Sequence, residues 1–182
     1  IVRIIPSGDH KDARVLVYVH GGAYVYFSAG TMIGLPSLIA EATGIEVISI
    51  DYTLAPQARW PAITDEVLTV WKALLAYGRD AGSIGFFGDS AGGGLAAGTV
   101  LKMRDQGVAL PGALWLVSPW SDISGVGDSY QTLAHSDPTL TPEMLAWSAE
   151  AYADPADHQN PYVSPVYGDY EKAFPPTLVQ GG

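Results

Sequence analysis

Five short apolar runs, rich in β-branched residues and bounded by turn residues, recur along the chain. Within each run the apolar residues are continuous, which is typical of strands buried on both faces of a parallel sheet. Helix-like stretches separate the runs, and in one of them Leu95, Thr99 and Met103 fall at helical spacing. The pattern predicts βαβ units with right-handed crossovers in a three-layer α/β domain. The predicted strands cover residues 14–20, 45–51, 83–88, 112–119 and 176–180, and the predicted helices cover residues 31–43, 63–77 and 91–104.

Residues 121–174 differ from the rest, because turn residues dominate them and only one helix pattern is clear. That helix is expected to begin after Thr141, whose side chain can cap it, with Pro142 at the first position and Glu143 in the first turn. An excursion of this kind between two strands is expected to lie over the edge of the active-site face.

Composition excludes several classes of function. The 182 residues are 48 % hydrophobic, enough for one sizeable core, and carry a formal net charge of −10, which repels nucleic acid. Cysteine is absent and the histidines lack metal-ligand spacing, so neither a metal nor another cofactor is expected. No apolar run approaches the roughly 20 residues that span a bilayer, and no signal peptide is visible, so we expect a soluble protein with no membrane span, the cytoplasm being the preferred compartment.

Gly88-Asp89-Ser90-Ala91-Gly92 fits the pattern GxSxG, in which a strand ends in a sharp turn and a helix begins at once. A buried-strand pattern precedes the motif and a helix pattern follows it, as that geometry requires. Ser90 would then be an exposed nucleophile near the positive end of a helix, with the N–H of Ala91 directed at an oxyanion. The competing interpretation, a small-residue turn of a nucleotide-binding unit, lacks GxGxxG or GxxxxGK[ST] spacing.

A second element follows an earlier predicted strand, where His20, Gly21 and Gly22 come directly after an apolar run. Acyl transfer needs at least two donors aimed at the developing negative charge, and glycines leave backbone N–H groups unobstructed. An ordinary tight turn is the alternative. The order of oxyanion loop and then nucleophile elbow favours the catalytic interpretation.

The segments "HGGAY", "DYTLAPQARWPA", "GDSAGGGLAAG", "VSPWSD" and "NPYVSPVYGD" together resemble the hormone-sensitive-lipase-like esterases, or bacterial family IV, of the α/β-hydrolase superfamily. The resemblance implies an α/β-hydrolase fold, with a mostly parallel central sheet, over essentially the whole chain. It also implies that Ser90 is the nucleophile and that Gly21, Gly22 and Ala91 form the oxyanion hole. Ala23 departs from the family's third glycine, and one added methyl is expected to narrow the site slightly.

The base that would activate Ser90 is not evident. In α/β-hydrolases the acid and then the histidine follow the serine, but the later histidines, His135 and His158, both lie in the turn-rich excursion. The resemblance places acid and histidine beyond Gly182 and a cap segment before Ile1, so residues 1–182 are expected to be a partial catalytic domain that is inactive alone.

Other assignments stay open. Asp122, just past a predicted strand, and His158 are an internal alternative for the missing pair. His20 is expected to anchor its loop, His10 to lie in a solvated turn, and Asp89 to support the elbow rather than act as the triad acid. Tyr24 and Trp120 follow strands and are either pocket walls or core residues.

The sequence thus predicts a carboxylic ester hydrolase that acts on short to medium acyl esters through a serine nucleophile and an acyl-enzyme. A small-molecule ester is the expected partner, and a homo-oligomer is left open. The alternatives are a non-catalytic small-molecule receptor on the same fold, which keeps the serine elbow but lacks the histidine, and an inactive fragment.

Overall fold

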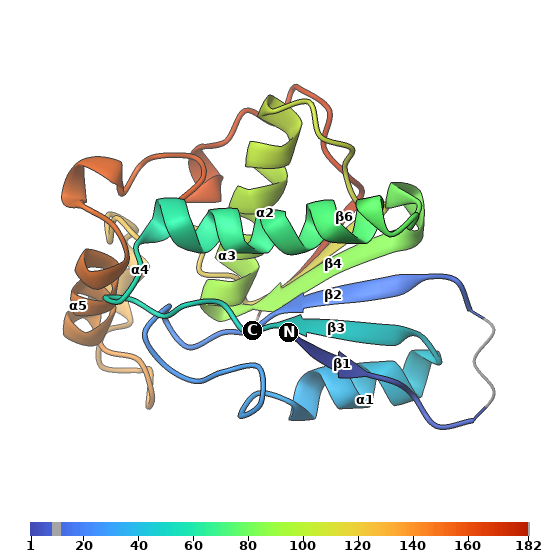
Figure 1. Ribbon diagram of the computed structural model, residues 1–182. Helices are drawn as coiled ribbons and strands as arrows, with labels where there is room; N and C mark the ends of the chain where they lie inside the picture. The colour runs from blue at the N-terminus through green and yellow to red at the C-terminus, as the bar shows by residue number, and fades with distance from the viewer. Residues whose placement is uncertain (9–11, 182) are drawn as a thin grey trace.

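The computed structural model describes residues 1–8 and 12–181 and contains a six-stranded, mostly parallel sheet (Figure 1). The strand order is β1-β3-β2-β4-β5-β6. Among the strand pairings of these described residues, only that of β1 with β3 is antiparallel. The α/β fold and all five predicted strands are confirmed. The short edge strand β1 is not among the predicted strands. The strands are β1 (Val2–Ile4), β2 (Val15–Val19), β3 (Glu46–Ile50), β4 (Ile84–Asp89), β5 (Ala113–Val117) and β6 (Thr177–Gln180).

The helices also follow the predicted order, with shifts at their ends. Trp60, and not Ile63, begins the second long helix, because Pro61 occupies its first turn, where a missing N–H costs nothing. Between the last two strands lies the excursion of residues 121–174, with two α-helices and two short 3-10 helices. The helices are α1 (Gly34–Thr43), α2 (Trp60–Ala76), α3 (Ser90–Asp105), α4 (Ser129–Thr132) and α5 (Pro142–Tyr152), with 3-10 turns η1 (Ala81–Ser83), η2 (Pro155–Asp157) and η3 (Pro165–Tyr167).

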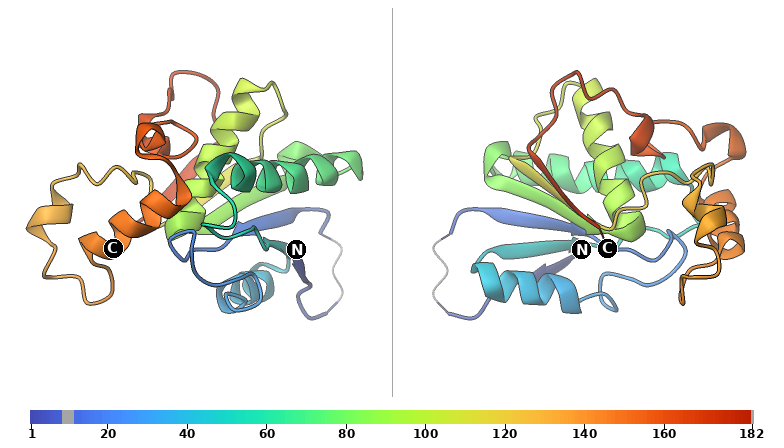
Figure 2. Two further views of the ribbon diagram at one scale, coloured as in Figure 1. Left: turned by 60° about the vertical axis from the view of Figure 1, so that its left-hand side comes forward. Right: turned by 180° about the vertical axis from the view of Figure 1, so that it is seen from behind.

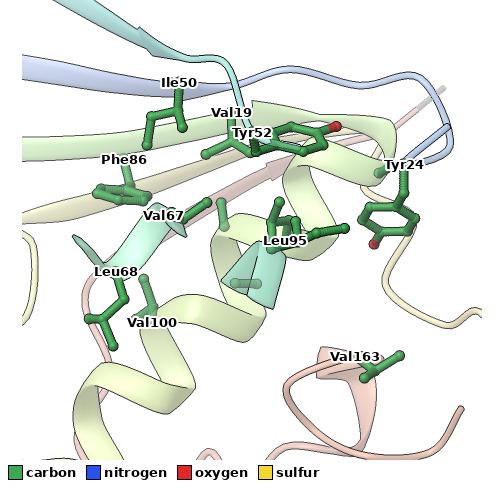
Figure 3. Close-up of a cluster of buried hydrophobic side chains, with 14 of the residues drawn as sticks. Val19, Tyr24, Ile50, Tyr52, Val67, Leu68, Phe86, Leu95, Val100 and Val163 are labelled. Atoms are coloured by element: carbon green, nitrogen blue, oxygen red, sulfur yellow. The ribbon is translucent and has the colours of Figure 1, made fainter. Parts of the chain in front are cut away.

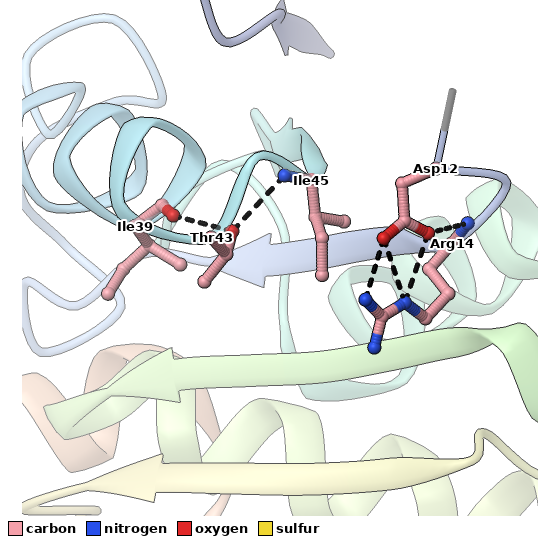
Figure 4. Close-up of polar contacts among 5 residues, drawn as sticks. All are labelled: Asp12, Arg14, Ile39, Thr43 and Ile45. Atoms are coloured by element: carbon pink, nitrogen blue, oxygen red, sulfur yellow. Dashed lines mark hydrogen bonds and ion pairs between the residues drawn. The ribbon is translucent and has the colours of Figure 1, made fainter. Parts of the chain in front are cut away.

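Helix α1 is shorter at its start than the sequence pattern predicts. The Thr31 hydroxyl accepts a hydrogen bond from the Ser28 N–H, and the Ser28 hydroxyl accepts one from the Thr31 N–H. These bonds hold a turn where the helix was expected to begin. At the other end the Thr43 hydroxyl donates to Ile39 O at 2.7 Å and accepts from Ile45 N at 3.2 Å, leading the chain into β3 (Figure 4). The same close-up shows the Asp12–Arg14 ion pair ahead of β2.

The sheet is the middle of three layers. Helices α2 and α3 cover one face and α1 covers the other (Figures 1 and 2). Side chains from β2, β3 and β4 meet α2 and α3 in the main core, shown in Figure 3, where residues such as Val19, Phe86 and Leu95 pack together. Both faces of the central strands are buried, which explains why their sequences are apolar throughout.

The topology places a switch point at the carboxyl ends of β2 and β4. Strand β3 lies on one side of β2 and β4 on the other, so the crossovers that follow β2 and β3 leave in opposite directions. Open α/β sheets bind ligands at such a switch point. Helices α4 and α5 of the excursion lie at the same end of the sheet (Figure 1).

Replacing Thr141 by alanine should lower the free energy of unfolding by about 1 kcal/mol. As predicted, the Thr141 hydroxyl caps α5, accepting from Met144 N at 3.2 Å, and the variant loses this partner for an otherwise orphaned N–H. Chemical denaturation of the complete protein checks the value. Thr141→Ser, which keeps the hydroxyl, is the control and should stay near wild type, and equal losses in both variants would contradict a capping role.

Candidate active site

Ser90 stands at a sharp strand-to-helix elbow. Strand β4 ends at Asp89, and α3 begins at Ser90, whose φ of 51° lies in the left-handed region that side chains other than glycine rarely adopt. Such strain persists only where the surrounding structure enforces it, and it concentrates at functional positions. The geometry is that of a nucleophile elbow, and Ser90 is partly exposed.

The glycines on either side of Ser90 allow this elbow to sit close to its neighbours. A Cβ on Gly88 would lie 2.5 Å from Gly92 O, inside the elbow itself. A Cβ on Gly92 would collide with the carbonyl oxygens of Val19 and His20, at the end of β2. Both contacts are with backbone atoms, so the first turn of α3 can press against the loop after β2 only where no side chain intervenes.

The loop after β2 carries backbone donors that lack acceptors among the described residues. Gly22, Ala23 and Tyr24 have successive positive φ values of 114°, 51° and 65°, and Gly22 O accepts from the N–H groups of Val25 and Tyr26. Within residues 1–8 and 12–181 the N–H groups of Gly22 and Ala23 have no hydrogen-bond partner. Ala91, as the second residue of α3, also has no acceptor for its N–H inside the helix.

Gly21 does not fit the role expected of it. Its N–H donates to Asp89 Oδ1 at 3.0 Å, so the hydrogen is already engaged and is not free to meet an oxyanion. The N–H groups of Gly22 and Ala23, next along the loop, have no such acceptor in the described part of the chain. The difference arises because the contact joins the loop after β2 to the end of β4, which a local motif does not reveal.

Asp89 links the oxyanion loop to the nucleophile elbow. Its Oδ1 accepts both the Gly21 N–H and the Tyr18 hydroxyl, the latter at 2.6 Å. Burial, reinforced by the neighbouring carboxylate, raises the pKa of Tyr18, so the phenol remains a donor. This agrees with the expectation that Asp89 supports the site and is not the triad acid.

Asp89→Ala should lower the free energy of unfolding by about 1–3 kcal/mol, because the Gly21 N–H and the Tyr18 hydroxyl would lose their acceptor. Asp89→Asn can retain an amide oxygen at the same place and should lose less. Thermal denaturation of both variants in the complete protein, with kcat measured alongside, checks this. Equal stability of wild type and Asp89→Ala would show that the link contributes nothing.

His20 holds the same loop through a ring stack and a hydrogen bond. The side chain is fully buried and stacks on the Tyr52 ring, with 4.3 Å between the ring centroids. Its Nδ1 atom lies 2.7 Å from Gly21 O. A carbonyl oxygen only accepts, so Nδ1 carries the proton and donates. Burial lowers the pKa of His20 and keeps the ring neutral. The expected anchoring role is consistent with these contacts.

The two aromatic residues left open between pocket wall and core, Tyr24 and Trp120, differ in their burial. Tyr24 is fully buried in the main core and therefore does not line a pocket. Trp120 is half-buried against the same core, its Nε1 donates to the Tyr130 hydroxyl at 2.7 Å, and its backbone N–H donates to Ser90 O at 2.8 Å. Trp120 thus contacts the elbow through its backbone N–H and stacks on the buried Tyr24 ring.

The internal acid and base alternative is not assembled. Asp122 accepts from the N–H and hydroxyl of Ser124 and from the Tyr167 hydroxyl, and in the described part of the chain it has no bond to His158. His158 Nε2 is buried without a partner there, and His135 is exposed. None of the described histidines bonds to Ser90, and His10 lies outside the described residues.

The described residues hold no group of three or more potential metal ligands among His, Asp and Glu. Likewise, every helix in residues 1–8 and 12–181 is too short or too polar to cross a bilayer.

Comparisons with known proteins agree with this geometry. The model of the alpha/beta hydrolase fold family matches residues 16–182. An acetyl-hydrolase of Streptomyces hygroscopicus is 34 % identical over 94 % of this chain and 57 % of its own length, and an ethyl acetate hydrolase of Pseudomonas putida is 34 % identical over 96 % and 57 %. A crystal structure of an esterase from the bacterial hormone-sensitive lipase family superposes with a TM-score of 0.91 at 38 % identity, over 97 % of this chain and 59 % of that one.

The chain thus spans little more than half the length of these relatives. Within that span, the family model covers strands β3 to β6, the elbow and the loop described above. The similarity to a hormone-sensitive-lipase-family esterase matches the resemblance of the motifs. The chain belongs to the alpha/beta hydrolase fold family.

Proposed function

We propose that the complete protein is a carboxylic ester hydrolase in which Ser90 is the nucleophile. The observation that carries the proposal is the pairing of a strained, partly exposed serine at the start of α3 with unpartnered N–H groups in the loop after β2. Asp89 bridges the two elements and fixes their relative position. Relatives named as an acetyl-hydrolase and an ethyl acetate hydrolase favour esters of short acyl groups.

The proposed reaction proceeds in two halves. Ser90 Oγ attacks the ester carbonyl while a base takes its proton, and the N–H groups of Gly22, Ala23 and Ala91 stabilise the oxyanion that forms. Collapse of this intermediate releases the alcohol, which takes the proton from the base, and leaves an acyl-enzyme. The base then takes a proton from a water molecule that attacks the acyl-enzyme, and the same N–H groups stabilise the second oxyanion. Collapse of this intermediate releases the carboxylic acid as the proton passes from the base to Ser90 Oγ.

The base and its acid partner are proposed to come from the remainder of the complete protein. No histidine in the described residues bonds to Ser90, and relatives of this chain are nearly twice as long. A serine without such an imidazole is a poor nucleophile at neutral pH. Residues 1–182 alone are therefore expected to keep only the residual acceleration that binding and oxyanion donors supply.

The test is the hydrolysis of p-nitrophenyl esters of increasing acyl length by the complete protein. The proposal predicts turnover of the acetate and butyrate esters, with kcat/KM falling as the acyl chain lengthens to palmitate. Absence of turnover, combined with saturable binding of a small ester measured by calorimetry, would instead favour a receptor on this fold. Turnover confined to the palmitate ester would contradict the preference for short acyl groups.

A further inference from the structure

The loop that bears the proposed oxyanion donors needs external support. Ala23 and Tyr24 both hold positive φ values, which cost energy in residues with a Cβ, and the chain would relax from them if nothing opposed it. Asp89 holds the start of the loop through Gly21. The other end, at Tyr24, must be held in a different way.

One hydrogen bond and one side chain hold that end. The N–H of Ala55 donates to Tyr24 O at 2.9 Å, which fixes the carbonyl. The Tyr24 ring is fully buried, so it resists rotation of the backbone that carries it. Relaxation of φ at this residue would swing the ring out of its site and break the turn closed by Gly22 O.

The ring that packs closest on Tyr24 comes from the excursion. Tyr152, the last residue of α5, stacks on it with 3.7 Å between centroids and 5° between planes, and is itself fully buried. Trp120 stacks more loosely, at 5.6 Å and 27°. Two aromatic rings therefore cover Tyr24, and the tighter contact is made by a residue 128 positions away in the chain, counted from 24 to 152.

We infer that Tyr152 is a positioning residue of the proposed oxyanion hole, acting through its stack on Tyr24. Through this contact α5 holds the loop in the conformation that presents the N–H groups of Gly22 and Ala23. This role of α5 rests on the proposed function, in which Ser90 attacks an ester and the loop donors stabilise the oxyanion. Tyr152 touches no reacting atom, and its effect is on transition-state stabilisation, because the negative charge on the ester oxygen develops on the way to the tetrahedral intermediate and is absent from the bound ester.

The test compares Tyr152→Leu and Tyr152→Met, which remove the stacking ring but keep apolar bulk, with Tyr152→Phe, which keeps the ring. Val163→Ala is the matched control, since Val163 is a fully buried core residue of the same excursion and lies outside the loop. In the complete protein, both ring-removing variants should lower kcat for p-nitrophenyl butyrate by about 10- to 100-fold, less than the loss of a whole donor, while KM changes by less than about threefold.

The Ki of a trifluoromethyl ketone, whose adduct carries an oxyanion, should rise in parallel with the fall in kcat. Tyr152→Phe and Val163→Ala should keep both values within about twofold of wild type, even where the control lowers the Tm. Wild-type kcat in Tyr152→Leu or Tyr152→Met, or an equal loss in Val163→Ala, would overturn the inference while leaving the proposed function standing. Absence of ester hydrolysis in the wild type would overturn the proposed function and, with it, the inference.

Discussion

Ser90→Ala is expected to lower kcat for ester hydrolysis by at least about 10³-fold in the complete protein, with little change in KM. The reason is chemical, because the variant lacks the oxygen that forms the acyl-enzyme and leaves only binding and the oxyanion donors. Alanine at this position also keeps the Cβ and the strained φ of 51°, so the fold should be retained. Steady-state kinetics with p-nitrophenyl butyrate measure the effect.

Ser83→Ala provides the matched control for that experiment. Ser83 precedes the same strand β4 but at its opposite end, where its hydroxyl donates to Asp80 Oδ2 at 3.0 Å. Its replacement should leave kcat and KM within about twofold, since surface substitutions of this kind change stability by only a few tenths of a kcal/mol. Equal activity of wild type and Ser90→Ala would exclude Ser90 as the nucleophile.

Gly92→Ala is expected to have the second large effect, on stability as well as activity. The added Cβ would collide with the backbone carbonyl oxygens of Val19 and His20, which neither a rotamer change nor a flexible neighbour can relieve. Forcing α3 away from β2 should cost about 3 kcal/mol and lower the Tm by roughly 5–10 °C. It should also reduce kcat, because Ser90 and the donor loop would move apart.

Gly34→Ala is the corresponding control. Gly34 is the exposed first residue of α1, and an added Cβ there would meet no heavy atom within 4 Å. The substitution should leave the Tm unchanged or raise it slightly, since alanine restricts the unfolded chain. A Tm for Gly92→Ala as high as that of Gly34→Ala would contradict the close approach of the elbow to β2.

Much of the fold was predictable because strands buried on both faces of a sheet have continuous apolar sequences. The runs that became β2 to β6 are apolar, and the Thr141-Pro142 start of α5 has both a capping side chain and a residue suited to the first turn. Strand β1 escaped prediction, since its sequence Val-Arg-Ile is too short to show a period. Its pairing with β3 depends on a partner some 45 residues later in the chain.

In the candidate site, the position of the serine was predictable from sequence, but the free backbone donors were not. Ser90 was predictable because a strand, a GxSxG motif and a helix follow one another locally. Which N–H groups of the adjoining loop stay free was not, because that depends on the Asp89 carboxylate reaching Gly21 from another strand. A motif identifies residues, whereas backbone donors are assigned by long-range contacts.

The burial of aromatic side chains was also not predictable from sequence. Tyr24 follows an oxyanion-type loop and could equally wall a pocket or fill a core, because large rings suit both environments. Its left-handed backbone turns the ring inward, onto Tyr152, and so settles the question in favour of the core. No spacing in the sequence indicates this turn, since nothing marks Tyr24 as a residue with positive φ.

Labelling the complete protein with paraoxon, with the adduct mapped by mass spectrometry, tests the proposed covalent acylation of Ser90. We expect one diethylphosphoryl group per chain, carried by the peptide that contains Ser90, with activity lost in proportion to labelling. The oxyanion donors should accelerate this reaction as they accelerate acylation. A label on another residue that accounts for the loss of activity, or full activity in protein labelled at Ser90, would contradict the assignment of Ser90 as the nucleophile.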